Sequence, residues 1–291
     1  MPRLTTELLH AESELRTGRP REARDWLATV LPAVERSGDR RSLRTALNLR
    51  GVAELEMGEL DAAARTFARV LELARSDADE LLIARALNNL GALADMRDHF
   101  DDAVSLYERA IPSYQRLGDA RGLAETHHNL GISLRHRGQL HVAEDHERQA
   151  ISYACEARNA TLECLARLGL GEIALARNDA RLAEAMARHA ANQFVASNDR
   201  LREADALRVL AAACLAQDNL SAAEDALHRA CHLAVTNGAR LLEAEIRRLN
   251  TELLFAAGHG EQAMREASEA ARLFEEVGSS AKAAEARGRW L

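Results

Sequence analysis

The sequence predicts an all-α protein: a right-handed α-solenoid of seven helix-turn-helix repeats followed by a short C-terminal helix. Two observations predict this class. Glycine recurs at Gly51, Gly91, Gly131 and Gly171, always 40 residues apart, and the apolar residues are mostly alanine and leucine, with only 3% aromatics. A unit of this length that is poor in aromatics is typical of closely packed helices, which bury their apolar faces by stacking on the next unit.

Small residues recur in the same register. Twelve residues after each of these glycines, and at the matching place in the other repeats, stands an alanine: Ala23, Ala63, Ala103, Ala143, Ala183, Ala223 and Ala263. A second small residue follows seven residues later: Val30, Val70, Ala110, Ala150, Ala190, Ala230 and Ala270. Glycine inside a helix costs roughly 1 kcal/mol relative to alanine, so its recurrence indicates close approach by a neighbouring backbone. Replacing Ala143 by Leu should destabilise the fold by about 1–3 kcal/mol through overpacking.

Each repeat divides into a helix A and a helix B at residues that tolerate turn geometry. These residues are Gly18, Gly58, Asp98, Gly138, Asn178, Asp218 and Gly258. A pair of the Gly-Asp type, which can end helix B and cap the next helix A, stands at 38–39, 118–119, 198–199 and 278–279. We therefore predict one domain over 1–291, with repeats 1–40, 41–80, 81–120, 121–160, 161–200, 201–240 and 241–280, and with 281–291 as a capping or truncated helix.

Composition and charge exclude several classes of function. The net charge is −7, with 45 acidic residues against 38 basic ones, so we expect no direct binding to nucleic acid. No run approaches 18 apolar residues and the N-terminus lacks an apolar signal core, so we expect a cytoplasmic protein with no membrane partner. The four cysteines show no CxxC spacing, as expected of reduced thiols. Only Lys282 among the basic residues is a lysine, which we interpret as the coding bias of a GC-rich bacterial genome.

The small–alanine–small pattern in helix-turn-helix units resembles the tetratricopeptide repeat (TPR). The 40-residue period, the Asn-Leu-Gly triplets at 89–91 and 129–131, and the Gly-Asp pairs are similar to a longer-period subclass found in kinesin light chains, spindle-orientation adaptors and bacterial regulators. The resemblance covers residues 1–280. It implies that helix A of each repeat lines a concave surface on which partners bind, but the fold by itself does not define a function.

Polar residues follow this expected concave stripe in the N-terminal half of the chain. The candidate peptide-binding residues are Asn48, Arg85, Asn88, Asn89, His128, Asn129 and Arg135. Carboxamide and imidazole groups spaced about one repeat apart could pair with the donors and acceptors of an extended peptide backbone, and the resemblance implies the same use. The alternative is that these groups cap turns or bond to neighbouring helices.

The sequence contains no catalytic constellation, so we predict that the chain is not an enzyme. It has no nucleophile elbow, P-loop or HExxH motif. His228 and His232 have the i, i+4 spacing of metal ligands on one helix, but no third ligand is close in sequence. We therefore predict no metal site and no cofactor.

Three functions remain, and all of them act through contacts. The first is a scaffold that binds an extended peptide or a partner helix in a concave groove. The second is a regulatory or sensor TPR segment of a bacterial signalling or transcription protein whose effector domain is absent from this chain. The third is self-association through the end repeats, because no repeat precedes the helix that carries Leu4, Leu8 and Leu15. At the other end, Lys282, Glu285, Arg287 and Arg289 could form the polar outer face of a cap.

Overall fold

The computed structural model describes residues 2–290, and side chains are described for residues 6–288. Within residues 2–290 the chain forms fifteen α-helices and no strand, which confirms the all-α prediction. The helices are α1 (Pro2–Arg16), α2 (Pro20–Ser37), α3 (Arg40–Glu56), α4 (Leu60–Ser76), α5 (Glu80–Met96), α6 (Phe100–Leu117), α7 (Ala120–His136), α8 (Leu140–Glu156), α9 (Ala160–Ala176), α10 (Ala180–Ala196), α11 (Arg200–Leu215), α12 (Leu220–Asn237), α13 (Arg240–Ala256), α14 (Gly260–Glu276) and α15 (Ser280–Trp290). From α1 to α14 the odd numbers are the A helices and the even numbers the B helices.

The turns inside the repeats lie where the sequence predicts them. The backbone angle φ is between 60° and 82° at all seven predicted residues: Gly18, Gly58, Asp98, Gly138, Asn178, Asp218 and Gly258. This left-handed conformation closes the end of each A helix, as at Gly58, whose N–H donates to the carbonyl of Leu55 at 2.9 Å. Glycine, asparagine and aspartate are the residues that adopt it at least cost.

The turns between repeats were only partly predicted. Ala78 (φ 52°) and Arg158 (φ 50°) adopt the left-handed conformation at positions where glycine or asparagine stands in the other repeats. A side-chain cap begins the next A helix at both places. Oδ1 of Asp79 accepts a hydrogen bond from the Leu82 N–H at 3.0 Å, and Asn159 caps α9 in the same way.

The recurrent small residues are packing positions, as predicted. All seven alanines of the first series are completely buried. At the recurrent glycines, however, the group that approaches is a side chain of helix B and not a neighbouring backbone. A Cβ added at Gly51 would lie 2.5 Å from the ring of Phe67, and one added at Gly91 would lie 2.6 Å from the ring of Tyr107. Each glycine therefore provides space for a large residue on the outer helix.

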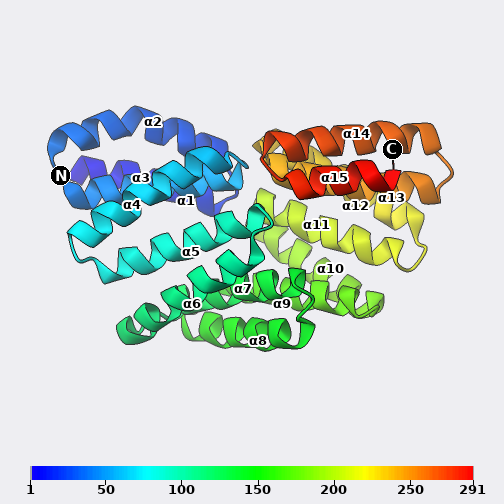
Figure 1. Ribbon diagram of the computed structural model, residues 1–291, viewed down its shortest axis with the longest axis horizontal. Helices are drawn as coiled ribbons and strands as arrows, with labels where there is room; N and C mark the ends of the chain where they lie inside the picture. Colours follow the sequence, from blue (N-terminus) through cyan, green and yellow to red (C-terminus); the bar gives the residue numbers. More distant parts are fainter. Residues whose placement is uncertain (1, 291) are drawn as a thin grey trace.

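The solenoid curves so far that its first and last repeats meet, a closure that the sequence does not indicate. Turns of repeats 1–3 pack on turns that follow repeats 5–7. Beside Gly18 an added Cβ would lie 2.6 Å from the backbone nitrogen of Leu201, and the Ser279 hydroxyl donates to Oδ2 of Asp98 at 3.0 Å across 181 residues. Figure 1 shows the blue N-terminal and orange C-terminal helices meeting end to end. We call this contact the seam.

Both ends of the chain are covered by the chain itself. Leu8 and Leu15 are 7% exposed, so the expectation of an uncovered face at these residues is wrong, while the side chain of Leu4 lies outside the described residues. On α15, Ala283 and Ala286 are buried against the preceding repeat. The terminal-cap expectation holds for Glu285 and Arg287, which are exposed.

Lys282 departs from the expected cap. Its ammonium group lies 2.9 Å from Oε1 of Glu245 and 3.7 Å from Oδ1 of Asp98. Lys282 therefore joins the last helix to α13 and to the turn that follows α5. The side chain of Arg289 and the whole of Leu291 lie outside the described residues.

Candidate functional site

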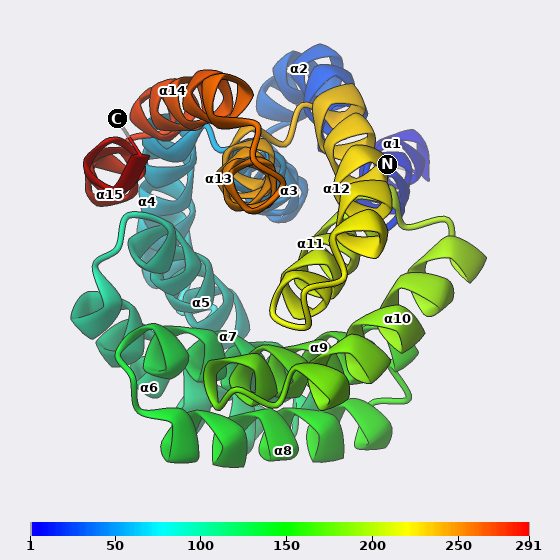
Figure 2. The ribbon, with the colours of Figure 1, turned by 90° about the vertical axis from the view of Figure 1, so that its right-hand side faces the viewer.

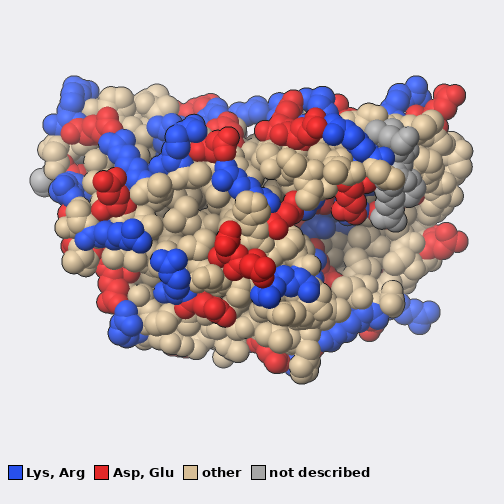
Figure 3. Space-filling model, in the orientation of Figure 1, with Lys and Arg blue, Asp and Glu red and all other residues tan. Residues whose placement is uncertain are grey.

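The A helices of repeats 2–7 lie toward the inside of a ring and the B helices around its outside (Figure 2). We define the inner wall as the residues at positions 5, 8, 9, 12 and 15 of repeats 2–7, counted from the first residue of each repeat. These residues lie on α3, α5, α7, α9, α11 and α13. Figure 3 shows the molecule hollowed at its right side, below α14 and α15. On the face shown there, acidic and basic side chains alternate, and no extended basic patch is seen. The seven sequence-predicted residues are members of this set by its definition. Asn88 is buried, Arg85 is exposed, and the other five are half-buried.

Four asparagines of the inner wall form two hydrogen-bonded pairs that link adjacent repeats. Nδ2 of Asn89 donates to Oδ1 of Asn48 at 3.0 Å, and Nδ2 of Asn129 donates to Oδ1 of Asn88 at 3.5 Å. In each pair, position 9 of one repeat reaches position 8 of the repeat before it. The alternative prediction, that the amides bond to neighbouring helices, is therefore correct for these contacts.

These pairs use only part of the hydrogen-bonding capacity of the amides. A carboxamide has two N–H donors and an oxygen that can accept two hydrogen bonds. Among the described residues, no side-chain nitrogen or oxygen of the four asparagines is buried without a partner. Asn48, Asn89 and Asn129 are half-buried, so their remaining donors and acceptors are open to solvent or to a ligand.

The same line of contacts continues at His128, where the partner comes from helix B. Nδ1 of His128 lies 2.9 Å from Oε2 of Glu147, a residue of α8 that is only 1% exposed. Position 9 of the next repeat is Gly169, and a Cβ there would lie 2.3 Å from Oε1 of Glu147. A Cβ added at Gly131, on the other side, would lie 2.8 Å from the same oxygen. The two glycines therefore admit the carboxylate between α7 and α9.

The charges of this pair depend on each other. Burial alone would lower the pKa of His128, but the carboxylate of Glu147, together with Glu172 and Asp205, raises it above its ordinary value. Burial raises the pKa of Glu147, which the imidazolium of His128 and the guanidinium of Arg135 oppose. A buried carboxylate destabilises a fold by several kcal/mol unless a cation is next to it, so His128 is what permits Glu147 at this position.

Sequence reasoning missed Glu147 because only helix A was expected to line the concave surface, and Glu147 lies on a helix B. The signal was present in the repeat register. The matching position holds Leu27, Phe67, Tyr107, Ala187, Leu227 and Ala267 in the other repeats, and only the fourth has an acid. An acid at a recurrent apolar position, facing a glycine in the next repeat, indicates a carboxylate directed into the fold.

Two more histidines of the fourth repeat stack on each other, and neither ring is charged at pH 7. The rings of His127 and His146 lie 5.1 Å apart, with their Nδ1 atoms 2.9 Å apart, and Tyr153 stacks on His127. Burial, with a contribution from His146, lowers the pKa of His127 to about 4, and burial lowers the pKa of His146 as well. Both rings are therefore neutral at pH 7 and serve packing.

The second half of the inner wall is a network of ion pairs. Glu172 accepts from Arg135 at 3.1 Å and from Arg208 at 2.8 Å, and Arg208 also pairs with Asp205. Burial alone would raise the pKa of Glu172, but the two guanidinium groups lower it to about 2. Arg135, one of the seven predicted residues, is therefore already paired.

The network extends to the seam. Glu245 lies 3.4 Å from Arg248 and 2.9 Å from Lys282, and these cations outweigh burial and lower its pKa to about 2. Arg248 also pairs with Glu252 at 2.8 Å. Glu245, Arg248 and Glu252 therefore pair with one another, and Lys282 adds a second cation beside Glu245.

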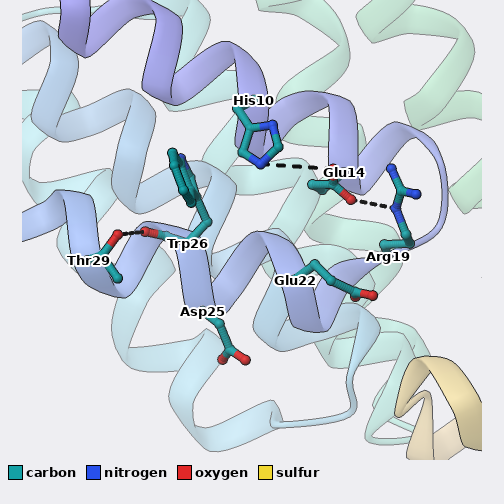
Figure 4. A pocket seen from close by; sticks show the side chains of 7 residues that line it. All are labelled: His10, Glu14, Arg19, Glu22, Asp25, Trp26 and Thr29. Atoms are coloured by element: carbon teal, nitrogen blue, oxygen red, sulfur yellow. Dashed lines mark hydrogen bonds and ion pairs between the residues drawn. The ribbon is translucent and has the colours of Figure 1, made fainter.

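A separate recess lies on the outer side between α1 and α2 (Figure 4). It has a volume of about 620 Å³ and is lined by His10, Glu14, Arg19, Glu22, Asp25, Trp26 and Thr29. His10 packs edge-on against Trp26 with ring centroids 4.7 Å apart, and Glu14 pairs with Arg19. These side chains contact one another, and the recess does not adjoin any of the seven predicted residues.

Metal and membrane sites find no support in the described part of the chain. No group of three or more His, Cys, Asp or Glu side chains between residues 6 and 288 is placed to hold a metal ion. No helix described here has the length and apolar character needed to span a bilayer.

The geometry defines an α-solenoid of helix-turn-helix repeats with a polar concave face. The sequence profile of the tetratricopeptide repeat family matches residues 3–76, 44–116 and 82–156, which together cover more than half of the chain. The chain belongs to the tetratricopeptide repeat family. No curated protein sequence matches it.

Several solved structures share the fold at low sequence identity. A Rap protein complexed with Competence and Sporulation Factor is 13% identical, with a TM-score of 0.64 over 100% of this chain and 97% of that chain. NprR in complex with its cognate peptide NprX is 12% identical, with a TM-score of 0.66 over 98% and 88%. The Rap conjugation gene regulator of plasmid pLS20, in complex with the Phr* peptide, is 13% identical, with a TM-score of 0.63 over 99% and 94%.

Proposed function

We propose that this protein is a non-enzymatic binding scaffold that holds an extended peptide against its inner wall. The proposed contacts are Asn48, Arg85, Asn88, Asn89, His128, Asn129 and Arg135. The observation that carries the proposal is the pair of amide contacts between adjacent repeats. They hold four carboxamides in a row, at helical positions where asparagine is a poor helix former, and leave donors and acceptors unused.

A row of fixed amides suits an extended backbone. Peptide N–H and C=O groups that have no partner of their own gain hydrogen bonds from Asn side chains with complementary donors and acceptors. The similarity to solenoids that were solved with peptides supports this use. We further propose that the whole chain acts as one binding unit in the bacterial cytoplasm, since the seam ties its first repeats to its last.

The second candidate function is a regulatory or sensor segment that acts on an effector domain outside this chain. Its support is the similarity to a signal transduction ATPase with a tetratricopeptide repeat sensor, which is 16% identical with a TM-score of 0.53 over 98% of this chain and 44% of that chain. Reading the coding sequence beyond Leu291 separates the two candidates. A DNA-binding or enzymatic domain in frame supports the sensor, and a stop codon supports the independent scaffold.

Selection from a library of random short peptides, displayed and bound to the purified protein, tests the leading proposal. Asn89→Ala combined with Asn129→Ala removes the donor of each amide pair. Affinity for the selected peptides should fall at least tenfold, while the free energy of unfolding should fall by only about 1–2 kcal/mol, the worth of two hydrogen bonds.

The matched control changes two exposed amides of the outer helix α10, Asn192→Ala with Gln193→Ala, and should leave peptide affinity unchanged. Failure to enrich any peptide contradicts the proposal. So does an affinity that the inner double substitution leaves intact.

A further inference from the structure

The seam joins distant repeats without a shared hydrophobic core. Among the described residues, each of the nine hydrophobic clusters is built from repeats that follow one another along the chain, and none contains residues from both before 120 and after 200. A solenoid derives its stability from the packing of each repeat on its neighbours. The seam can therefore open while every repeat remains folded, at a much lower free energy than global unfolding.

The contacts that hold the seam are single contacts between turns. The Asp98 carboxylate accepts a hydrogen bond from the Ser279 hydroxyl at 3.0 Å and lies 3.7 Å from the Lys282 ammonium group. On the side of repeats 1 and 6, a Cβ added at Gly238 would lie 2.6 Å from Nη2 of Arg21, so the start of α2 touches the end of α12. Figure 2 shows these two helices side by side.

One part of the seam buries more negative than positive charge. Glu56 ends α3, and its Oε2 is buried without a hydrogen-bond partner. The charged groups that act on it are Arg202 of α11 and Asp199, which caps α11 and is 2% exposed. The Arg202 guanidinium already donates to the Asp199 carboxylate, and Glu125 of α7 also acts on it. Ionised Glu56 is therefore a second carboxylate beside one cation.

This arrangement links closure of the seam to a proton. A buried carboxylate without its hydrogen bonds is unfavourable, and the protonated carboxyl group avoids that penalty. Burial raises the pKa of Glu56 to about 7, an effect that Arg202 opposes and Asp199 increases. When the seam opens, water reaches the carboxyl group and its pKa returns to the ordinary value. A group whose pKa is raised in the closed form favours closure at low pH, and this contribution is lost as pH rises through 7.

We propose that the seam is a pH-sensitive latch: the ring is closed while the carboxyl group of Glu56 carries a proton, and release of this proton to solvent separates repeat 2 from the start of repeat 6. The latch goes beyond the proposed function, since it acts without a peptide. Opening moves the first repeats away from the last ones and changes the curvature of the inner wall.

Double electron–electron resonance between two spin labels measures closure directly. The labels are attached through Glu22→Cys on α2 and Thr236→Cys on α12, two exposed positions on opposite sides of the seam. Cys155→Ser and Cys231→Ser remove the native thiols that are not fully buried. This doubly labelled protein is the reference for the variants that follow.

The distance between the labels should depend on pH. A short distance should dominate at pH 6, and the ratio of long to short distances should rise about tenfold between pH 6 and pH 8, as a carboxyl group with its ordinary pKa in the open form requires. Glu56→Gln should keep the short distance at both pH values. The matched control Glu72→Gln, at an exposed position of the outer helix α4, should behave as the reference does.

A variant that weakens the seam elsewhere makes the open form measurable. Asp98→Gly removes the contacts with Ser279 and Lys282 and keeps the left-handed backbone (φ 62°), which glycine adopts freely. It should raise the fraction of long distances at both pH values and preserve the dependence on pH.

Two results would overturn the proposal. Equal distance distributions at pH 6 and pH 8 in Asp98→Gly would show that no pH-sensitive latch exists. Opening at pH 8 that persists when Glu56→Gln is added would show that Glu56 is not the group that controls it. The peptide scaffold is tested separately, because no peptide is present in these measurements.

Discussion

In repeats 2–4 the inner wall carries asparagines whose hydrogen-bonding capacity is partly unused and an arginine without a partner, whereas in repeats 5–7 it carries arginines and acids that pair with one another. In the first half the asparagine amides keep unused donors and acceptors, although Glu125, His128 and Arg135 are paired. In the second half the charged side chains pair with one another. A ligand gains contacts in the first half at little expense, while in the second it must first break ion pairs. We therefore propose that the N-terminal half of the inner wall binds the ligand and that the ion pairs of the C-terminal half contribute stability.

The His128–Glu147 pair lies at the boundary between the halves and gives the largest expected effect. His128→Gln leaves the carboxylate of Glu147 buried without a cation, which should destabilise the protein by about 3–5 kcal/mol at pH 7. Urea unfolding measures this loss. The double variant His128→Gln with Glu147→Gln should recover most of it, because two neutral amides can bond across the same gap. A single variant as stable as the double one contradicts a charged pair.

The titration of His128 sharpens the same point. Glu147 raises the pKa of His128 above its ordinary value against the effect of burial, so Glu147→Gln should lower that pKa, since only Glu172 and Asp205 then oppose burial. The imidazole resonances of His128, followed by NMR across pH 5–9, report the shift. An unchanged midpoint would show that Glu147 does not hold the proton on His128.

The substitution Glu172→Gln tests the C-terminal half of the inner wall, where the charged side chains are paired. Glu172→Gln leaves Arg135 and Arg208 without their shared carboxylate and should destabilise the protein by about 1.5–3 kcal/mol in urea unfolding. Affinity for a selected peptide should not fall, because the substitution leaves the asparagine pairs in place and removes a partner that competes for Arg135. A large loss of affinity with little loss of stability would reverse the division between the two halves.

A substitution at the seam should have a smaller effect on the free energy of unfolding, and that effect should be a stabilisation. Oε2 of Glu56 is buried without a hydrogen bond, and burial raises its pKa to about 7, with Arg202 opposing the rise and Asp199 adding to it. A raised carboxyl pKa favours the protonated folded state, so the contribution of Glu56 is favourable below pH 4.5 and is lost as pH rises through 7. Glu56→Gln should therefore stabilise the protein at pH 8 by on the order of 1–2 kcal/mol and have little effect at pH 4.5.

Thermal unfolding of both proteins at the two pH values measures the difference. Equal stabilisation at both values would show that the carboxyl group of Glu56 does not titrate in the fold.

Arg85→Gln gives the smallest expected change in stability. Because Arg85 has no hydrogen bond or ion pair within the described residues, its replacement should alter the free energy of unfolding by less than about 0.5 kcal/mol. A loss above 1 kcal/mol in urea unfolding would reveal an intramolecular role and weaken its assignment to a ligand.

The repeat architecture could be predicted because its signals are local and recur. Glycine at Gly51 and Gly91, the fully buried alanines and the left-handed turns each serve one unit, so seven copies reinforce one prediction. The seam could not be predicted in this way. It depends on the small rotation between successive repeats, which accumulates until Asp98 reaches Ser279, and no single repeat encodes it.

The candidate site was predictable as a set of positions and not as a set of contacts. Helical spacing placed all seven residues on the inner wall, but it could not show that Arg135 is paired and Arg85 is not. That difference depends on whether an acid stands at the right position of the next repeat, as Glu172 does for Arg135. The contact of Glu147 could not be predicted, because its side chain extends from the outer helix α8 into a space left by two glycines.

One NMR measurement tests the division of the inner wall most directly. A selected peptide is titrated into the ¹⁵N-labelled protein, and the side-chain signals of both halves are followed together. The carboxamide resonances of Asn48, Asn89 and Asn129 and the Nε–H of Arg85 should shift, while the Nε–H signals of Arg208 and Arg248 should stay in place. Shifts confined to Arg208 and Arg248, with the asparagine signals unmoved, would contradict the account.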